Sequence, residues 1–299
     1  RSRNPFSLLV ATQFAAAGSV LVVSHFLGNA QIFFAKILYQ LRDHFFLLET
    51  AKTGLLFVLM VVPTVFLGAS FPVAVRIRTR SLASLGESVG KLYAVSTVGA
   101  FLGSFSAGFV LVPLLGKAMG LSFLAGAQVF TAMTASMLAG RRPSLRVVPT
   151  VLSVTLLAGC LFLPRWDRAS LTRGKYLRPD LYGDALENMS LMDSLFLGRK
   201  RLAHLCTDQD ILWIEDGIGG LVAVGRTVNS LGATIMFLSV NGKIVTSTQW
   251  ELHMMTIAGH LPMMFHRNAK NALVIGLGGG ITAGEMLYYP LETLDVVEI

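Results

Sequence analysis

The residues best suited to bind a small molecule lie near the end of the sequence and follow the apolar run Ala272–Ile275. They form a glycine cluster made of Gly276, Gly278, Gly279 and Gly280. Glycines permit a tight turn and a close backbone approach to a ligand, and the N-terminus of a following helix favours a polar or anionic group. A second apolar run ends in Glu298, about 20 residues after the loop, where a carboxylate can accept hydrogen bonds from both ribose hydroxyls.

The order strand, glycine loop, helix, strand, acid therefore predicts a nucleoside-binding site. The alternatives are a tight turn without a ligand for the glycines and a solvated strand end for Glu298. Two parallel strands do not complete a sheet, so we expect the printed chain to be part of a longer protein. The absence of an initiator methionine before Arg1 gives the same expectation at the other end.

The composition places most of the chain in the membrane class. It is 53% hydrophobic and 14% charged, with a mean hydropathy of +0.63. Uncharged stretches of about 18 or more apolar residues are long enough to cross a bilayer. The sequence predicts a multi-pass helical bundle in the cell membrane with five spans: Phe6–Leu27, Thr53–Val75, Leu92–Gly116, Ala118–Gly140 and Val147–Leu163.

The net charge of +8 comes largely from arginine clusters beside these spans. One cluster contains Arg76, Arg78 and Arg80, and the other contains Arg141, Arg142 and Arg146. Basic residues at such places set membrane topology, so we expect no nucleic acid partner. Two cytoplasmic clusters would put Arg165 outside, whereas a nucleoside site is expected to face the cytoplasm, and the sequence leaves this conflict open. The two cysteines, Cys160 and Cys206, have neither zinc-ligand spacing nor a disulfide framework.

Small residues recur along one predicted span, at Gly99, Gly103 and Gly108. This spacing predicts close helix packing within the bundle, with a homodimer face or a substrate path as alternatives. No charged residue lies in the middle of a span, which argues against an ion-coupled transporter. The segment Gln31–Leu48 mixes phenylalanines with charges and predicts an interfacial amphipathic helix.

The sequence predicts four regions: membrane helices over 1–164, a linker with one or two short helices over 165–208, a small antiparallel β unit over 209–248, and the start of a Rossmann-like α/β domain over 249–299. Strand-like runs in the third region are Ile211–Ile214, Gly220–Arg226, Ala233–Val240 and Lys243–Ser247. The dipeptide Asn241–Gly242 between two of them predicts a hairpin. Residues Trp250–Phe265 predict a helix before the glycine loop.

From about Ser7 onward the chain resembles the membrane-fused members of the spermidine synthase (polyamine aminopropyltransferase) family. The resemblance rests on the order of these segments: Gly90–Gly116, Trp213–Val224, Asn241–Ser247, Gly259–Pro262, Val274–Gly284 and Val296–Ile299. It implies transfer of an aminopropyl group from decarboxylated S-adenosylmethionine to a polyamine such as putrescine, without a metal. This chemistry requires that the amine and the donor are aligned. It also requires acidic residues that hold the cationic amine and a base that deprotonates it.

The resemblance also assigns roles to particular residues. Gly276, Gly278, Gly279 and Gly280 match the nucleoside loop, and Glu298 matches the ribose-binding acid. Glu251 matches an acidic substrate contact, and Gln249 is a candidate polar contact to the nucleoside, with a solvated helix start as its alternative. The catalytic residue is expected beyond Ile299.

Three positions depart from the family pattern. Gly279 stands where the family has an amine-binding aspartate, and Met254 and Met255 stand where it has a tyrosine and a histidine. His260 and His266 are expected to be structural. These departures leave two alternatives: a methyltransferase-like or non-catalytic nucleoside-binding membrane protein that uses S-adenosylmethionine, and a membrane transport or scaffold module.

Overall fold

The computed structural model describes residues 4–79, 81–139, 147–162, 166–174, 183–196, 209–217, 219–266 and 268–298. The described chain is mostly helical, with long apolar helices and an antiparallel sheet. It divides into two compact units. Unit 1 comprises Arg1–Asp167, Gly183–Gly198 and Asp216–Ile218, and unit 2 comprises Arg168–Tyr182, Arg199–Glu215 and Gly219–Ile299. Among the residues singled out above, these lie outside the described ranges: Arg80, Arg141, Arg142, Arg146, Arg165, Cys206 and Ile299.

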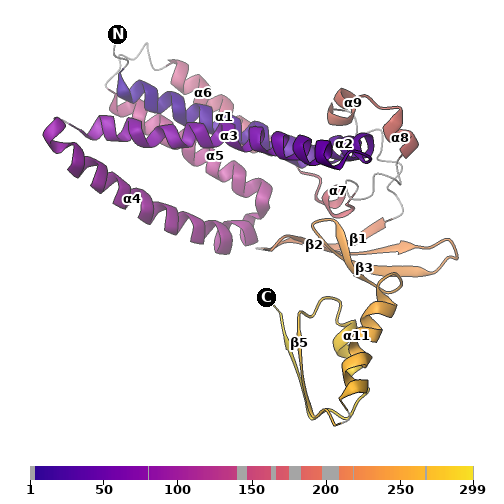
Figure 1. Ribbon diagram of the computed structural model, residues 1–299. Helices are drawn as coiled ribbons and strands as arrows, with labels where there is room; N and C mark the ends of the chain where they lie inside the picture. Colours follow the sequence, from indigo (N-terminus) through magenta and orange to yellow (C-terminus); the bar gives the residue numbers. More distant parts are fainter. Residues whose placement is uncertain are drawn as a thin grey trace. The chain divides into compact units, whose positions relative to one another are not determined.

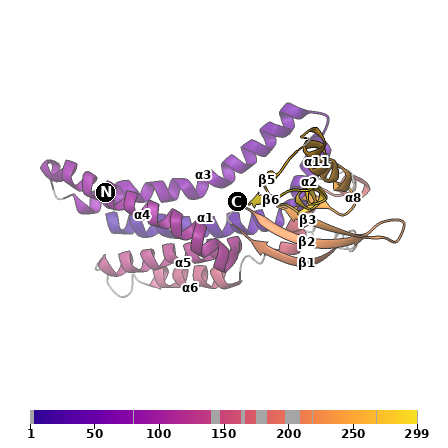
Figure 2. The same ribbon diagram turned by 90° about the horizontal axis from the view of Figure 1, so that it is seen from below.

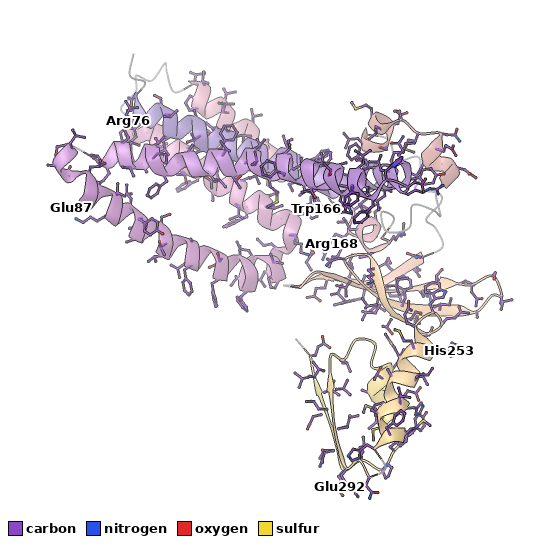
Figure 3. All side chains as sticks on the ribbon, in the orientation of Figure 1. Arg76, Glu87, Trp166, Arg168, His253 and Glu292 are labelled. Carbon is purple, nitrogen blue, oxygen red and sulfur yellow. The ribbon has the colours of Figure 1, made fainter. Side chains whose placement is uncertain are left out.

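Unit 1 is a bundle in which the first helix packs against three others (Figure 1). Its larger elements are α1 (Pro5–Asn29), α2 (Gln31–Leu41), α3 (Phe45–Arg78), η1 (Leu82–Ser84), α4 (Leu85–Ser106), η2 (Ala107–Leu111), α5 (Val112–Leu138) and α6 (Val147–Phe162). Helix α1 contacts α3, α5 and α6, and its Phe14 and Leu21 share a buried cluster with Val129 of α5. After α6, the indole Nε1 of Trp166 (labelled in Figure 3) donates to the carbonyl of Ser24, 2.9 Å away, and so ties the chain back to α1.

Three helices of the described residues are long and apolar enough to cross a membrane: Pro5–Gly28, Phe45–Arg78 and Leu82–Leu138. The third contains two of the predicted spans, one on each side of Gly116. Gly116 has φ 75° and ψ 167°, a conformation that glycine adopts without a steric penalty, so the helical run breaks where the first of these two spans was predicted to end. The fifth predicted span corresponds to the shorter apolar helix Val147–Phe162.

Helix α3 starts eight residues before the predicted span, because Phe45–Lys52 continues the same helix. Glu49 and Lys52 are one turn apart, with Lys52 Nζ 2.5 Å from Glu49 Oε1. Pairing across one turn lets two charges lie on a helix surface at little cost. The predicted interfacial helix over Gln31–Leu48 therefore ends early, at Leu41.

The shortened helix α2 packs against two short helices of the same unit, α8 (Gly183–Glu187) and α9 (Leu191–Phe196). The side chain of Lys36, only 4% exposed, points its ammonium group at the end of α8. Its Nζ donates to the carbonyl of Leu186 over 2.6 Å and to that of Glu187 over 3.4 Å. A cation at a helix C-terminus satisfies carbonyls that have no partner within the helix. Lys36 of the predicted interfacial helix thus lies against the end of α8.

Unit 2 begins with the short helix α7 (Arg168–Thr172) and contains a four-stranded sheet whose main strands are drawn in Figure 2. The strands lie in the order β1 (Gln209–Asp216), β2 (Leu221–Val228), β3 (Thr234–Val240) and β4 (Lys243–Ser247), at the predicted positions. Strands β2, β3 and β4 are antiparallel. The predicted hairpin is confirmed: Asn241 (φ 51°) and Gly242 (φ 81°) form the turn between Val240 and Lys243.

We expect Asn241→Ala to lower the free energy of unfolding by about 1–2 kcal/mol. The side-chain oxygen Oδ1 of Asn241 accepts the backbone N–H of Leu221 over 2.9 Å and so joins the turn to β2. Alanine loses this bond and is also less tolerant of a positive φ. Thermal melting in detergent measures the change, and a melting temperature equal to that of the wild-type protein would contradict this role of Asn241.

The remaining elements of unit 2 are α11 (Leu252–Phe265), β5 (Asn271–Ile275), α12 (Ile281–Met286) and β6 (Thr293–Val297). Strands β5 and β6 pair in parallel, from Asn271 opposite Thr293 to Ile275 opposite Val297. Helix α12 connects them and packs on α11. This arrangement puts the glycine loop at the carboxyl end of β5.

Candidate functional site

The site predicted from the sequence lies where the two parallel strands end. The backbone N–H of Gly276 donates to the carbonyl of Val297 over 2.7 Å and extends the ladder by one bond beyond β5. The chain then leaves the sheet as the glycine loop while β6 ends one residue before Glu298. In open sheets with parallel strands, ligands bind outside the carboxyl ends of the strands.

Three of the four loop glycines have backbone angles that favour glycine. The φ angles are 89° at Gly276, 54° at Gly278 and 75° at Gly280. Gly280 is also the N-cap of α12 in a left-handed conformation. The Cβ positions of Gly276 and Gly278 face open space, with no described heavy atom within 4 Å, so the loop backbone is accessible to a ligand.

Glu298 is brought to the glycine loop. One carboxylate oxygen, Oε2, accepts the backbone N–H of Leu277 in a short hydrogen bond. The other oxygen, Oε1, has no hydrogen-bond donor within the described part of the chain, and the residue is exposed. Oε1 is thus an exposed charged acceptor next to the loop, and such an oxygen can accept a hydrogen bond from a ribose hydroxyl.

Gly279 is in close contact with the neighbouring sheet. A Cβ at this position would lie 2.5 Å from Cγ2 and 2.8 Å from Oγ1 of Thr246, which is buried at the end of β4. The Thr246 hydroxyl in turn donates to the sulfur of Met255 over 3.0 Å. The place that the family resemblance gives to an aspartate is therefore bounded by a hydroxyl and a thioether, and a side chain would fit only if Thr246 moved.

Glu251 and Gln249 lie just before α11 and engage in local hydrogen bonds. Glu251 Oε2 accepts the hydroxyl of Ser247 over 2.6 Å, and Ser247 Oγ accepts the N–H of Trp250 over 2.8 Å. Gln249 Oε1 lies 3.4 Å from Nδ2 of Asn229. Both predicted substrate contacts thus take part in ordering the turn between β4 and α11, and their contact with a substrate stays a prediction.

A group of polar side chains between α11 and α12 was not assigned a joint role by sequence reasoning. His260 Nε2 lies 3.1 Å from Glu285 Oε2, and His260 Nδ1 lies 3.1 Å from the hydroxyl of Tyr289. The hydroxyl of Thr256 donates to Glu285 Oε1 over 3.1 Å. These bonds hold the helix that follows the glycine loop against α11. The spacing of Thr256 and His260, one turn apart, was the available signal.

Two other histidines, one near each end of α11, lie on the surface. His253, labelled on the first turn of α11 in Figure 3, is exposed, and Met254 beside it is 65% exposed. His266 follows the end of α11, where its N–H donates to the carbonyl of Pro262 over 3.0 Å. Across the described ranges no three side chains of the metal-binding types come together.

Comparison with known proteins gives two partial similarities. The chain is 38% identical over 63 residues to the polyamine aminopropyltransferase of Lachnospira eligens, which covers 21% of this chain and 22% of that protein. It is 42% identical over 62 residues to the polyamine aminopropyltransferase of Agathobacter rectalis, which covers 20% of this chain and 22% of that protein. The matched segment thus spans about a fifth of each relative. No protein-family model and no solved structure matches the chain.

Proposed function

We propose that this chain belongs to a membrane-bound, spermidine synthase-like transferase that moves an aminopropyl group from decarboxylated S-adenosylmethionine to a polyamine. The observation that carries the proposal is the meeting of Glu298 with the glycine loop at the ends of two parallel strands. The similarity to two polyamine aminopropyltransferases supports the choice of reaction. The proposal also includes the identity of the polyamine substrate, the attachment to a bilayer and the formation of a homodimer.

In this proposal unit 2 contains the start of a Rossmann-like domain. Glu298 Oε1 accepts the ribose hydroxyls, while the exposed backbone of Gly276 and Gly278 lets the nucleoside approach closely. An amine then attacks the carbon next to the sulfonium, and the carbon–sulfur bond breaks to leave a neutral thioether. Such a displacement depends on alignment of the two reactants and on a base that accepts the amine proton. The residues of this chain would supply the first of these requirements.

A second candidate is a nucleoside-binding protein of the methyltransferase type. It is favoured by the environment of Gly279, where Thr246 and Met255 take the space beside the loop. It is also favoured by Glu251 and Glu285, whose carboxylates are both hydrogen-bonded within the chain. A cationic polyamine requires carboxylates that are free to pair with it.

Calorimetric titration of the chain in detergent with decarboxylated and with ordinary S-adenosylmethionine separates the two candidates. The proposed transferase is expected to bind the decarboxylated nucleoside at least about tenfold more tightly, the equivalent of 1.4 kcal/mol. Tighter binding of ordinary S-adenosylmethionine would favour the methyltransferase type. If neither nucleoside binds, the proposal fails.

We also propose that the helices of unit 1 cross the cell membrane and that unit 2 faces the cytoplasm, where the nucleoside is available. The three long apolar helices support insertion in a bilayer. The exposed surfaces of these helices also support insertion, because Phe57, Phe101 and Phe105 are each more than half exposed. In water such surfaces would be unfavourable, whereas lipid chains solvate them.

A further inference from the structure

A second site lies in unit 1, in a groove at one end of the bundle. The groove has a volume of about 920 Å³ and is bounded by α1, α3, η1, α4 and α5. Part of its lining is apolar and includes Phe6, Leu9 and Ile77, and we call this part the apolar wall. Another part is polar and includes Arg78, Ser88 and Lys91, and we call it the polar wall. A groove lined by both kinds of side chain is suited to a ligand that is itself amphipathic.

The charges on the polar wall favour an anion. Lys91 Nζ lies 2.5 Å from Glu87 Oε1, and both side chains are more than 60% exposed. Exposed pairs of this kind are weak, so Lys91 can turn to a ligand at little cost. Arg78, in the last turn of α3, makes no hydrogen bond with a described residue. Two cations and one carboxylate leave a net charge of +1 in the groove, near the Glu87 label of Figure 3.

The hydroxyl groups of the wall differ in what they can donate. Ser84 donates to the carbonyl of Ser81 over 2.9 Å, Thr131 donates to that of Ala127 over 2.9 Å, and Thr134 donates to that of Thr131 over 2.9 Å. The hydroxyl protons of these three residues are therefore already engaged in hydrogen bonds. Ser88 is only 7% exposed and has no hydrogen-bond partner among the residues that the structure describes. The hydroxyl of Ser88 is therefore free to donate to a ligand in the groove.

We propose that this groove binds the phosphate group of an anionic phospholipid. Arg78 and Lys91 pair with the phosphate oxygens, and the Ser88 hydroxyl donates to one of them. The acyl chain lies along Phe6, Leu9 and Ile77. The apolar wall favours the lipid over free phosphate, because inorganic phosphate would leave that wall uncovered. This site is separate from the proposed nucleoside site, so either one can fail without the other.

The test uses the chain in detergent, titrated with dioctanoyl-phosphatidylglycerol and followed by native mass spectrometry. We expect one tightly bound lipid, and we expect Arg78→Gln with Lys91→Gln to weaken its binding about fivefold. Arg76→Gln is the matched control, since Arg76 lies on the same helical turn, is exposed and does not line the groove. Ser88→Ala removes one hydroxyl without changing a charge or the packing, and we expect it to weaken binding about threefold.

Several outcomes decide between sources of the ligand. Displacement of the lipid by inorganic phosphate at equal concentration would keep the phosphate site but assign it to a soluble ion. Equally tight binding of dioctanoylglycerol, which lacks the phosphate, would overturn the proposal. Equal weakening by Arg76→Gln would also overturn it, because the effect would then be general attraction to a positive surface.

Discussion

Glu298→Ala is expected to weaken binding of decarboxylated S-adenosylmethionine by at least about 1.5 kcal/mol, or more than tenfold in dissociation constant. The variant loses the carboxylate oxygen that is free to accept the ribose hydroxyls. It also loses the bond from the N–H of Leu277 to Oε2, which holds the loop in place. The loss of the free oxygen weakens the bound state directly, whereas the loss of the Leu277 bond also loosens the loop in the free protein. The first loss has no effect on a nucleoside that lacks the ribose diol.

Asp295→Ala is the matched control, because Asp295 is an exposed carboxylate on the same strand, opposite Leu273. Calorimetry with the nucleoside and with its 2′-deoxy analogue separates the two losses. Wild-type protein is expected to prefer the parent nucleoside, and Glu298→Ala is expected to bind both almost equally. Unchanged affinity in Glu298→Ala would remove this residue from the site.

Gly259→Val is expected to lower the free energy of unfolding of unit 2 by about 3 kcal/mol, the upper end of the usual cost of overpacking. A Cβ at Gly259 would lie 2.8 Å from the carbonyl oxygen of Thr282 and 2.8 Å from Cβ of Glu285. The positions of both atoms are fixed by the backbone of α12, so neither atom can rotate away. The valine would push α12 from α11, and the glycine loop that begins α12 would move with it.

Gly284→Ala tests whether any added methyl group has this effect. Gly284 is also helical, but a Cβ there would meet no described atom within 4 Å. Alanine is the better helix former by about 0.5–1 kcal/mol, so this variant is expected to be slightly more stable. Melting temperatures in detergent, with nucleoside affinity measured beside them, give the comparison. Similar melting temperatures for the two variants would contradict the contact of Gly259 with α12.

Local patterns were sufficient to predict much of the fold. Apolar runs and turn residues gave four strands close to their observed bounds, and the dipeptide Asn241–Gly242 gave a hairpin because both residues tolerate a positive φ. The strand order around the glycine loop also gave the parallel pairing of β5 with β6.

Contacts between distant segments could not be predicted from the sequence. The amphipathic pattern of α2 is the same whether its face meets lipid or protein, and only the position of α8 shows that Lys36 lies against helix carbonyls. The close approach of Thr246 to Gly279 depends on how β4 meets the loop, which no local pattern encodes.

The bend between β3 and β4 has a consequence for where mutations can be tolerated. A Cβ on Gly242 would lie 2.7 Å from the carbonyl oxygen of Leu171 and 2.8 Å from Cα of Gly174. The tip of this hairpin therefore packs against the main chain at the end of α7. Hairpin tips usually accept insertions and tags. We do not expect this tip to accept them, because any side chain added there would clash with the main chain at the end of α7.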